Sequence, residues 1–307
     1  MLLCVDDDSQ YEAVLAAPQR LLSLGSNDEI LVAHAIATLR WLPLKGNSPG
    51  WAGTERQIFR RVDDFLQAAA AALRDRGMSA TTLCLEGDVA SELLQAAHEN
   101  DADIVVAGAI GQARGQDFLV GSIAEKLESA AERDLLLIRG EAGLAPHGGI
   151  RVAVAVDDTE ASFHAIERFI EKFRLDHASI EIVHVIRVPP PRIDAAPEGT
   201  QSKSAVPAIV RERADHAINR ARELFSVHGL QPRLALRRGA PAREVLAAAK
   251  AFDAHLVVVG HGDRTTTERG IGWRGTVSKR VAHHAPCSVF IAASTHAANE
   301  PNPKGES

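Results

Sequence analysis

Short apolar runs alternate with amphipathic segments along the whole chain. The run DIVVAG (Asp103 to Gly108) places hydrophobic side chains on successive residues, which is typical of a strand covered on both faces. Between such runs hydrophobic residues recur at helical spacing, and four of these segments in the first half span residues 9–24, 54–76, 89–98 and 122–131. This alternation predicts a mostly parallel sheet with right-handed crossovers and with helices on both faces.

Two of the predicted helices carry a capping pattern at their start. Ser9 stands three residues before Glu12, and Thr54 stands three residues before Gln57, which is the spacing of a capping box. The pattern therefore predicts that these two helices begin at Ser9 and at Thr54.

The second half of the chain repeats the first at an offset of about 150 residues. The segments EILVAHAI and IEIVHVI carry His34 and His184 at matching places, and DADIVVAG matches DAHLVVVG. The repeat predicts two tandem α/β domains, residues 1–140 and 150–294, each a doubly wound, five-stranded parallel sheet of the Rossmann-like type. We expect residues 295–307 to form a disordered tail.

Composition narrows the class of protein. The formal net charge is −6, so the chain lacks the basic excess that a nucleic-acid surface or an anionic membrane would attract. Its three cysteines are far apart and odd in number, which favours a reducing compartment over a disulfide framework or a zinc site. The apolar stretch at the N-terminus is too short for a signal peptide. We therefore expect a cytoplasmic protein without nucleic-acid or membrane partners.

Glycines gather after the fourth predicted strand of the first half. Gly108 and Gly111 follow the strand, and Gly121-Ser122 precedes the next helix. A ligand in an open α/β sheet binds outside the carboxyl ends of the strands, and bare backbone there lets N–H groups approach a phosphate. The start of the following helix adds a partial positive charge, with Ser122 as its N-cap or as a hydrogen-bond donor to phosphate. By themselves, these glycines are equally compatible with ordinary turns.

The spacing Gly108-x2-Gly111-x9-Gly121-Ser122 resembles the nucleotide-binding signature of the universal stress protein family. The resemblance extends over both halves, with an aspartate after the first strand, a histidine in the second strand, a glycine turn (Gly87 and Gly239) and the closing strand APCSVFI. It implies two tandem domains of the adenine nucleotide alpha hydrolase-like fold and an ATP site, with Mg²⁺, in the first half. The residues that it implies for this site are Asp6 and Ala35 at the adenine, and Gly108, Gly111, Gly121, Ser122 and Ile123 along the ribose and phosphates.

The second half departs from this signature. The residue three positions after Gly260 is Asp263 rather than glycine, and the stretch up to Gly275 is two residues longer than in the first half. Asp263 and Glu268 would bring negative charge toward the phosphates, which three arginines would compensate: Arg264, Arg269 and Arg274. The sequence therefore favours a second half that serves as the structural partner of the first and has a degraded nucleotide site, but it leaves nucleotide binding by the second half open. The residues that match the first site are Asp157, Val185, Gly260, Gly275 and Thr276.

Other chemistry has less support in the sequence. The segment GNSPG has the G-x-S-x-G pattern of a nucleophile elbow, but Pro49 lacks the N–H that its oxyanion hole requires. His283 and His284 are neighbours that point in different directions on a helix, so we predict no metal site. For Asp6, a solvated acidic turn before a helix stays open as an alternative. The repeated histidines, His34 and His184, are predicted to pack at a strand end.

These patterns point to an ATP-binding stress-response regulator or a chaperone-like partner rather than a fast enzyme, with no catalytic residue assigned. A slow ATPase or a nucleotidyl-transferring enzyme on the same fold stays open as an alternative. A nucleotide-free interaction module is the third function that the sequence leaves open.

The closing strands of the two halves predict how these halves associate. Residues 134–138 and 288–292 are apolar and would leave a hydrophobic sheet edge if each half stood alone. In the family such strands pair between domains, so we expect the halves to associate face to face as an intramolecular pseudo-dimer. A homodimer of the whole chain also stays open.

Overall fold

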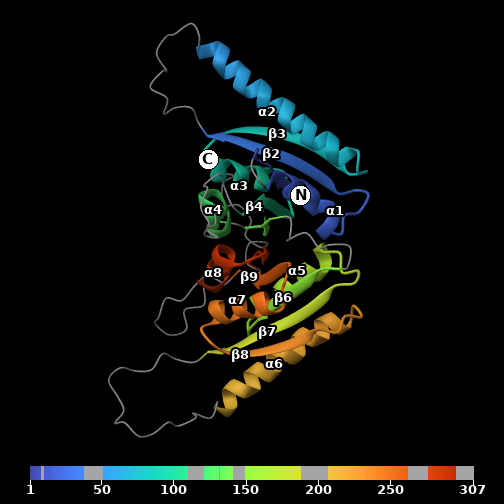
Figure 1. Ribbon diagram of the computed structural model, residues 1–307, viewed down its shortest axis with the longest axis vertical. Helices are drawn as coiled ribbons and strands as arrows, with labels where there is room; N and C mark the ends of the chain where they lie inside the picture. Colours follow the sequence, from blue (N-terminus) through green and yellow to red (C-terminus); the bar gives the residue numbers. More distant parts are fainter. Residues whose placement is uncertain are drawn as a thin grey trace, which may run out of the picture.

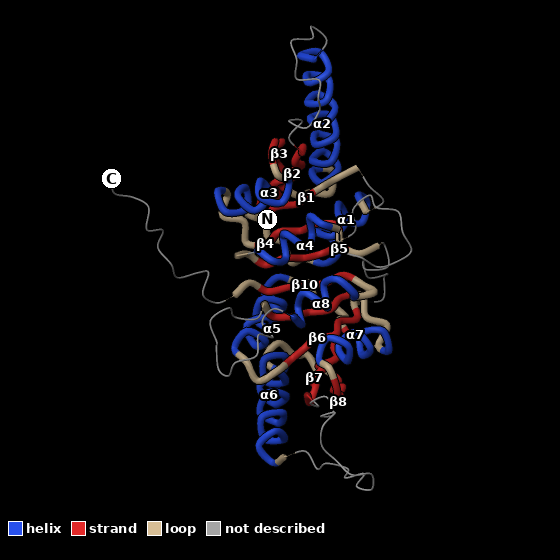
Figure 2. Tube along the Cα trace, turned by 90° about the vertical axis from the view of Figure 1, so that its left-hand side faces the viewer, coloured by secondary structure: helices blue, strands red, loops and turns tan. Residues whose placement is uncertain are grey.

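The computed structural model describes residues 1–7, 10–37, 51–109, 121–130, 132–140, 149–187, 207–261 and 276–294. Ten strands in these ranges form one continuous sheet, in the order β3-β2-β1-β4-β5-β10-β9-β6-β7-β8. Each half contributes five strands that run parallel to one another, and helices cover both faces of the sheet (Figure 1, Figure 2). The predicted fold, two tandem doubly wound five-stranded sheets, is confirmed.

Strands and helices alternate in the same order in both halves. The first half consists of β1 (Leu2–Cys4), α1 (Tyr11–Leu21), β2 (Glu29–Ala37), α2 (Trp51–Arg74), β3 (Ser79–Gly87), α3 (Val89–Glu99), β4 (Ile104–Gly108), α4 (Ser122–Ala130) and β5 (Asp134–Ile138). The second half consists of β6 (Arg151–Val156), α5 (Glu160–Lys172), β7 (Ser179–Arg187), α6 (Ala208–Ser226), β8 (Arg233–Gly239), α7 (Pro241–Ala251), β9 (Leu256–Gly260), α8 (Thr276–His284) and β10 (Ser288–Ala292). Among these helices none is long and apolar enough to cross a membrane.

The helix starts differ from the two predicted capping boxes. Ser9 lies outside the described residues, and α1 begins at Tyr11 with Gln10 as its N-cap. Helix α2 begins at Trp51, so that Thr54 lies inside it. The capping prediction is wrong for α2 because the helix extends one turn further toward the N-terminus. Side-chain caps occur instead at Asp88, which accepts a hydrogen bond from the Ser91 N–H at 3.2 Å, and at Thr159 in front of α5.

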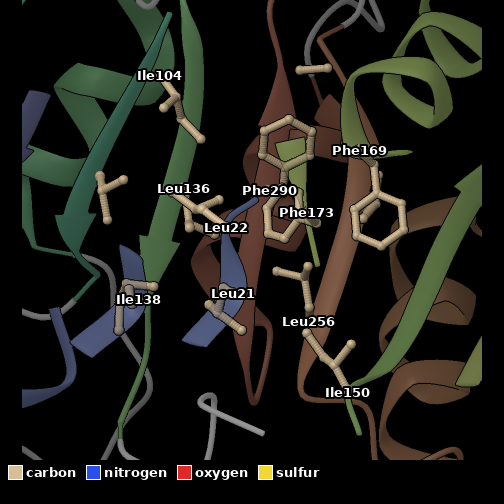
Figure 3. Packing of buried hydrophobic residues seen from close by; sticks show 14 of the residues in the cluster. Leu21, Leu22, Ile104, Leu136, Ile138, Ile150, Phe169, Phe173, Leu256 and Phe290 are labelled. Atoms are coloured by element: carbon tan, nitrogen blue, oxygen red, sulfur yellow. The ribbon is translucent and has the colours of Figure 1, made fainter. Parts of the chain in front are cut away.

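Two hydrophobic cores lie on opposite faces of the sheet, and their residues differ in size. The core under α1, α2, α5 and α6 holds the large aromatic side chains, such as Phe169, Phe173 and Phe290. The core under α3, α4, α7 and α8 is rich in alanine, which lets those helices approach the strands closely. The aromatic core continues across both halves: Figure 3 shows Leu22 and Leu136 of the first half beside Phe173 and Phe290 of the second.

The halves join where β5 pairs antiparallel with β10. Leu136 stands opposite Phe290 in this pairing, and the strands on either side of it are parallel. At its ends, Asp134 Oδ1 accepts a hydrogen bond from the Ala293 N–H at 2.9 Å, and Ser288 Oγ accepts one from the Arg139 N–H at 3.1 Å. The predicted pairing of the closing strands is present, but it joins the halves edge to edge rather than face to face, because it extends one sheet.

Polar contacts fix this junction on one face of the sheet. The Asp134 carboxylate, 1% exposed, lies 2.8 Å from the Arg168 guanidinium of α5. The residues that follow α1 and α5 also exchange two backbone hydrogen bonds, Ser23 N–H to Lys172 O at 2.9 Å and Arg174 N–H to Leu21 O at 2.8 Å. The buried carboxylate therefore has its charge balanced by a residue of the other half.

We predict that residues 1–140, expressed alone, dimerise or aggregate. Without β10, the outer edge of β5 exposes a row of unpaired backbone groups and the apolar side chains of a fully buried strand. Sedimentation velocity over a range of concentrations measures this association. A fragment that stays a folded monomer would contradict the prediction.

Candidate functional site

The expected site residues of the first half gather at one edge of the sheet. Strands β2 and β4 both pair with β1 in parallel, so their carboxyl ends lie side by side. Asp6 follows β1, Ala35 lies near the end of β2, and Gly108 ends β4. Three of the predicted positions thus meet at the edge where α/β proteins bind ligands. Gly111 lies outside the described residues.

A histidine ties the ends of β1 and β2 together beside Asp6. His34 Nδ1 lies 2.9 Å from the Val5 carbonyl oxygen and 3.9 Å from Asp6 Oδ1. The Asp6 side chain is 49% exposed, and its Oδ1 accepts a hydrogen bond from the Asp7 N–H at 2.9 Å. Ala35 is 8% exposed. The edge therefore presents a carboxylate that is accessible to solvent, together with a small side chain.

The second half has the same histidine contact. His184 Nδ1 lies 3.0 Å from the Val156 carbonyl oxygen, and burial lowers the pKa of His184 below its ordinary value of 6.5. His34 also packs edge-on against Phe65 of α2, with ring centroids 6.0 Å apart. Both histidines therefore join the first two strands of their half, which agrees with packing at a strand end.

Gly121 connects the end of β4 to the start of α4. Its N–H donates to the Ala109 carbonyl at 2.9 Å, and its own carbonyl accepts from the Glu125 N–H at 3.0 Å, so Gly121 caps the helix. Its N–H is thus engaged within the protein. The next amides along, of Ser122 and Ile123, are in the first turn, where helix geometry leaves N–H groups without a partner inside the helix. Both residues are exposed.

The strand-end glycines of the two halves face different neighbours. A Cβ at Gly108 would stand 2.8 Å from Oε1 of Gln10, the buried N-cap of α1. At Gly260 it would collide with the carbonyl of Ala161 in the first turn of α5. At the end of the fourth strand, the glycine therefore faces a side chain in the first half and main chain in the second half.

The other predicted residues of the second half are described only in part. Asp157 follows β6 and Val185 lies in β7, so both are at the equivalent edge. Thr276 begins α8. Gly275 and the altered stretch with its acids and arginines (Asp263, Arg264, Glu268, Arg269 and Arg274) lie outside the described residues.

A cluster of ion pairs, absent from the sequence predictions, joins this edge of the second half to α6. Asp158 Oδ1 lies 2.7 Å from His216 Nδ1, and Asp158 Oδ2 accepts a hydrogen bond from Arg213 Nε at 2.9 Å. Burial alone would raise the pKa of Asp158, but the hydrogen bonds from Arg213 and His216 lower it overall. Arg220 donates two hydrogen bonds to Glu160, at 2.6 and 2.8 Å, and lies over the ring of Phe163. We call these five residues (Asp158, Glu160, Arg213, His216 and Arg220) the α6 ion-pair cluster.

A spacing signal for this cluster is present in the sequence. Arg213, His216 and Arg220 stand at i, i+3 and i+7, which places them on one face of a helix. The offset of 152 residues between Gly87 and Gly239 places Arg61, Asp64 and Ala68 at the corresponding positions of α2. The first half thus has an arginine at the first of these positions but neither a histidine nor an arginine at the other two.

The helices that follow the two glycine-rich stretches contact each other across the junction. Glu125 of α4 lies 2.9 Å from Lys279 of α8 and 3.8 Å from His283. Beneath this pair, Ser278 donates a hydrogen bond to the buried Glu128 at 3.4 Å, and burial raises the pKa of Glu128. In the parts of the chain that the structure describes, no group of three or more His, Cys, Asp or Glu side chains could hold a metal ion.

The glycine environments predict unequal effects of one substitution. Gly260→Ala should reduce the free energy of unfolding by about 1–3 kcal/mol, because its Cβ meets backbone that must shift. Gly108→Ala should cost less, because the Gln10 side chain can turn aside. Urea denaturation of the two variants and the parent chain gives both values. Equal losses would contradict the described difference.

The buried His184 predicts a dependence of stability on pH. Its pKa is lowered on folding, so between its ordinary value of 6.5 and the folded value the unfolded chain binds more protons. The contribution of His184 to stability is therefore constant above about pH 7.5 and declines as the pH falls through 6.5. His184→Asn keeps a donor for the Val156 carbonyl but does not titrate. Urea denaturation from pH 8 to pH 5 should show a smaller decline for this variant, and equal declines would contradict the assignment.

The comparisons with known proteins agree with the repeated architecture. The model of the universal stress protein family matches the chain twice, at residues 1–139 and 150–293. A universal stress protein of Methanocaldococcus jannaschii is 23% identical over 141 residues, which are 46% of this chain and 80% of that protein.

Solved structures resemble the whole chain. A universal stress protein from Archaeoglobus fulgidus has a TM-score of 0.65 at 18% identity, with 95% of this chain and 97% of that chain covered. A putative universal stress protein from Pseudomonas aeruginosa has a TM-score of 0.61 at 14% identity, with 96% and 93% covered. These likenesses show the fold, and the two family matches show the ancestry of each half. The chain therefore belongs to the universal stress protein family, whose domain it contains twice in tandem.

Proposed function

We propose that the first half binds ATP with Mg²⁺ at the edge formed by β1, β2, β4 and the start of α4. The observation that carries the proposal is the position of α4. Gly121 holds the start of the helix at the end of β4, on the same sheet edge as the half-exposed carboxylate of Asp6. A helix start provides N–H donors and positive potential for phosphates, while a carboxylate at the other side of the edge accepts hydrogen bonds.

Each residue of this edge has a definite role in the proposal. Asp6 accepts a hydrogen bond from the adenine amino group, and the small Ala35 leaves room for the base. The backbone at Gly108 and Gly111 lies along the ribose, while the Ser122 hydroxyl and the amides of Ser122 and Ile123 donate to phosphate oxygens. Mg²⁺ binds through the phosphates and water, which is its usual arrangement in nucleotide sites.

The second half serves as the structural partner, so that one chain binds one nucleotide. Two contacts at the matching edge support this assignment: Asp157, the counterpart of Asp6, accepts a hydrogen bond from the Thr159 hydroxyl, and the neighbouring Asp158 and Glu160 are paired with arginines of α6. Gly260 contacts the backbone of α5, which limits the space for a ligand on that strand end. The antiparallel pairing of β5 and β10 supports an intramolecular pseudo-dimer, in which the second half closes the sheet edge of the first.

We assign the protein to stress-response regulation or chaperone-like partnership in the cytoplasm rather than to fast catalysis. The free cysteines Cys4, Cys84 and Cys287 are consistent with a reducing compartment. The repeated histidines, which are the residues most suited to acid–base chemistry, are engaged with main-chain carbonyls at the strand ends. Regulation then depends on nucleotide occupancy at the start of α4, a helix that contacts α8 of the other half.

We predict that Gly121→Val abolishes the binding of magnesium-ATP, because a branched side chain at the helix cap would occupy the approach of the phosphates. Ser122→Ala should bind more weakly by about 1–3 kcal/mol, since it lacks one hydrogen bond to a charged acceptor. Gly275→Val, the equivalent change in the second half, should leave the affinity unchanged. Isothermal titration calorimetry measures all three affinities.

Melting curves of each variant separate a folding defect from a loss of binding. Equal losses from Gly121→Val and Gly275→Val would show two working sites, and a loss from Gly275→Val alone would place the nucleotide in the second half. Mass spectrometry of the acid extract of the purified protein identifies the nucleotide that accompanies it. If neither the extract nor the calorimetry shows nucleotide, the proposal is wrong and the chain is a nucleotide-free module.

A further inference from the structure

At one end of the ten-stranded sheet, no further strand lies beside the edge strand β8 within the described residues. Strand β8 is the last strand of the sheet, and it forms hydrogen bonds with β7 on one side. Beside it lies a hollow of about 420 Å³ between the outer face of α6 and the start of β8. The hollow is lined by Asn219, Arg222, Glu223, Ser226, Gln231 and Pro232. We call β8 and this hollow together the β8 edge surface.

Apolar side chains are exposed on β8. Leu234 is 37% exposed and Leu236 is 53% exposed. Both lie on the face of the sheet that α6 covers at the neighbouring strand β7. Helix α6 packs on β7 and on α5. Its counterpart α2 packs mainly on β3, the strand at the other end of the sheet (Figure 1). Because α6 lies over β7 rather than β8, Leu234 and Leu236 stay exposed beside the outer backbone of β8 in the described part of the chain.

The opposite end of the sheet shows that these leucines are not required by the fold. The registers place Leu236 beside His184 and Cys84 beside the matching His34, so β8 and β3 can be compared position by position. Thr82, Cys84 and Glu86 of β3 then correspond to Leu234, Leu236 and Arg238 of β8. On this face of the sheet, β3 carries polar residues and an acid, as edges that avoid association commonly do, whereas β8 carries two leucines and an arginine.

The charges of the β8 edge surface favour a negatively charged partner. Arg233 and Arg237 share the second face of β8, Arg238 follows the leucines, and Arg222 lines the hollow. The acids that face these arginines are Glu181 of β7, near Arg233 and Arg237, and Glu223 of the hollow. Four arginines against two carboxylates leave a cationic surface, which disfavours a second copy of β8 in the same place.

We propose that the β8 edge surface binds an extended segment of a partner protein, in which acidic and apolar residues alternate, as an added strand. The main chain of the segment pairs with the open edge of β8. Because side chains alternate between faces, its apolar residues lie beside Leu234 and Leu236 while its acidic residues lie beside Arg233 and Arg237. The proposal does not depend on the nucleotide site.

A fluorescein-labelled nine-residue peptide of alternating valine and glutamate is the probe for this surface. Fluorescence anisotropy with the full chain should show saturable binding that weakens as salt is added. Leu236→Asp should weaken binding about tenfold or more, because the repulsion and the loss of apolar contact affect several cross-strand pairs. The matched change on the opposite edge, Cys84→Asp, should leave the affinity unchanged.

Two further arms test strand addition and charge selection separately. The same peptide with N-methyl groups on alternate residues cannot complete the ladder and should not bind. A valine–lysine peptide should fail to bind the parent chain and should bind the double variant Arg233→Glu/Arg237→Glu. Circular dichroism confirms that each variant is folded.

Some outcomes would overturn the proposal. Undiminished binding of the methylated peptide would show electrostatic adhesion without strand pairing, and an equal effect of Cys84→Asp would place the peptide elsewhere. Self-association of the chain through this surface, seen by sedimentation and removed by Leu236→Asp, would show that a second copy is the occupant. No binding of the valine–glutamate peptide at any salt concentration would exclude the proposed partner chemistry.

Discussion

The antiparallel pairing of β5 with β10 is the contact on which the rest of the molecule depends. Each half ends in a strand whose residues are all buried, and neither edge could face water without exposing backbone and hydrophobic side chains. Their pairing merges two sheets into one, carries the aromatic core across the junction and brings α4 against α8. The carboxylate of Asp134 is buried there because Arg168 of the other half balances its charge.

The pseudo-symmetry of the two halves holds in the scaffold and holds only in part at the edges where the strands end. His34 and His184 make the same contact with the first strand of their halves. Around them, Asp6 and its counterpart Asp157 are both exposed, but the acids that follow Asp157 differ: Asp158 and Glu160 pair with α6. A duplicated domain can keep its packing in both copies while a change in one helix face alters the contacts at the sheet edge, since the two depend on different residues.

The position of α6 links two of these differences. Its arginines bind Asp158 and Glu160, which follow β6, and the helix packs over β7 instead of extending over β8 as α2 extends over β3. The same helix therefore pairs with acids at the edge that matches our proposed nucleotide site, and it leaves Leu234 and Leu236 exposed at the far end of the sheet. In our two proposals, the first half binds a small ligand and the second half binds a protein segment.

Periodicity and repetition determined the fold, because a strand–helix alternation written twice leaves few topologies, and the spacing of Gly108, Gly121 and Ser122 located the edge of the candidate site. Sequence patterns placed neither the start of α2 nor the capping roles of Asp88 and Thr159, since capping spacings also occur inside helices. Only the tertiary structure decided that Arg213 and His216 meet Asp158, and that α6 leaves β8 uncovered. These contacts join residues more than fifty positions apart, and their geometry follows from how a helix settles on a sheet, which no local pattern of residues encodes.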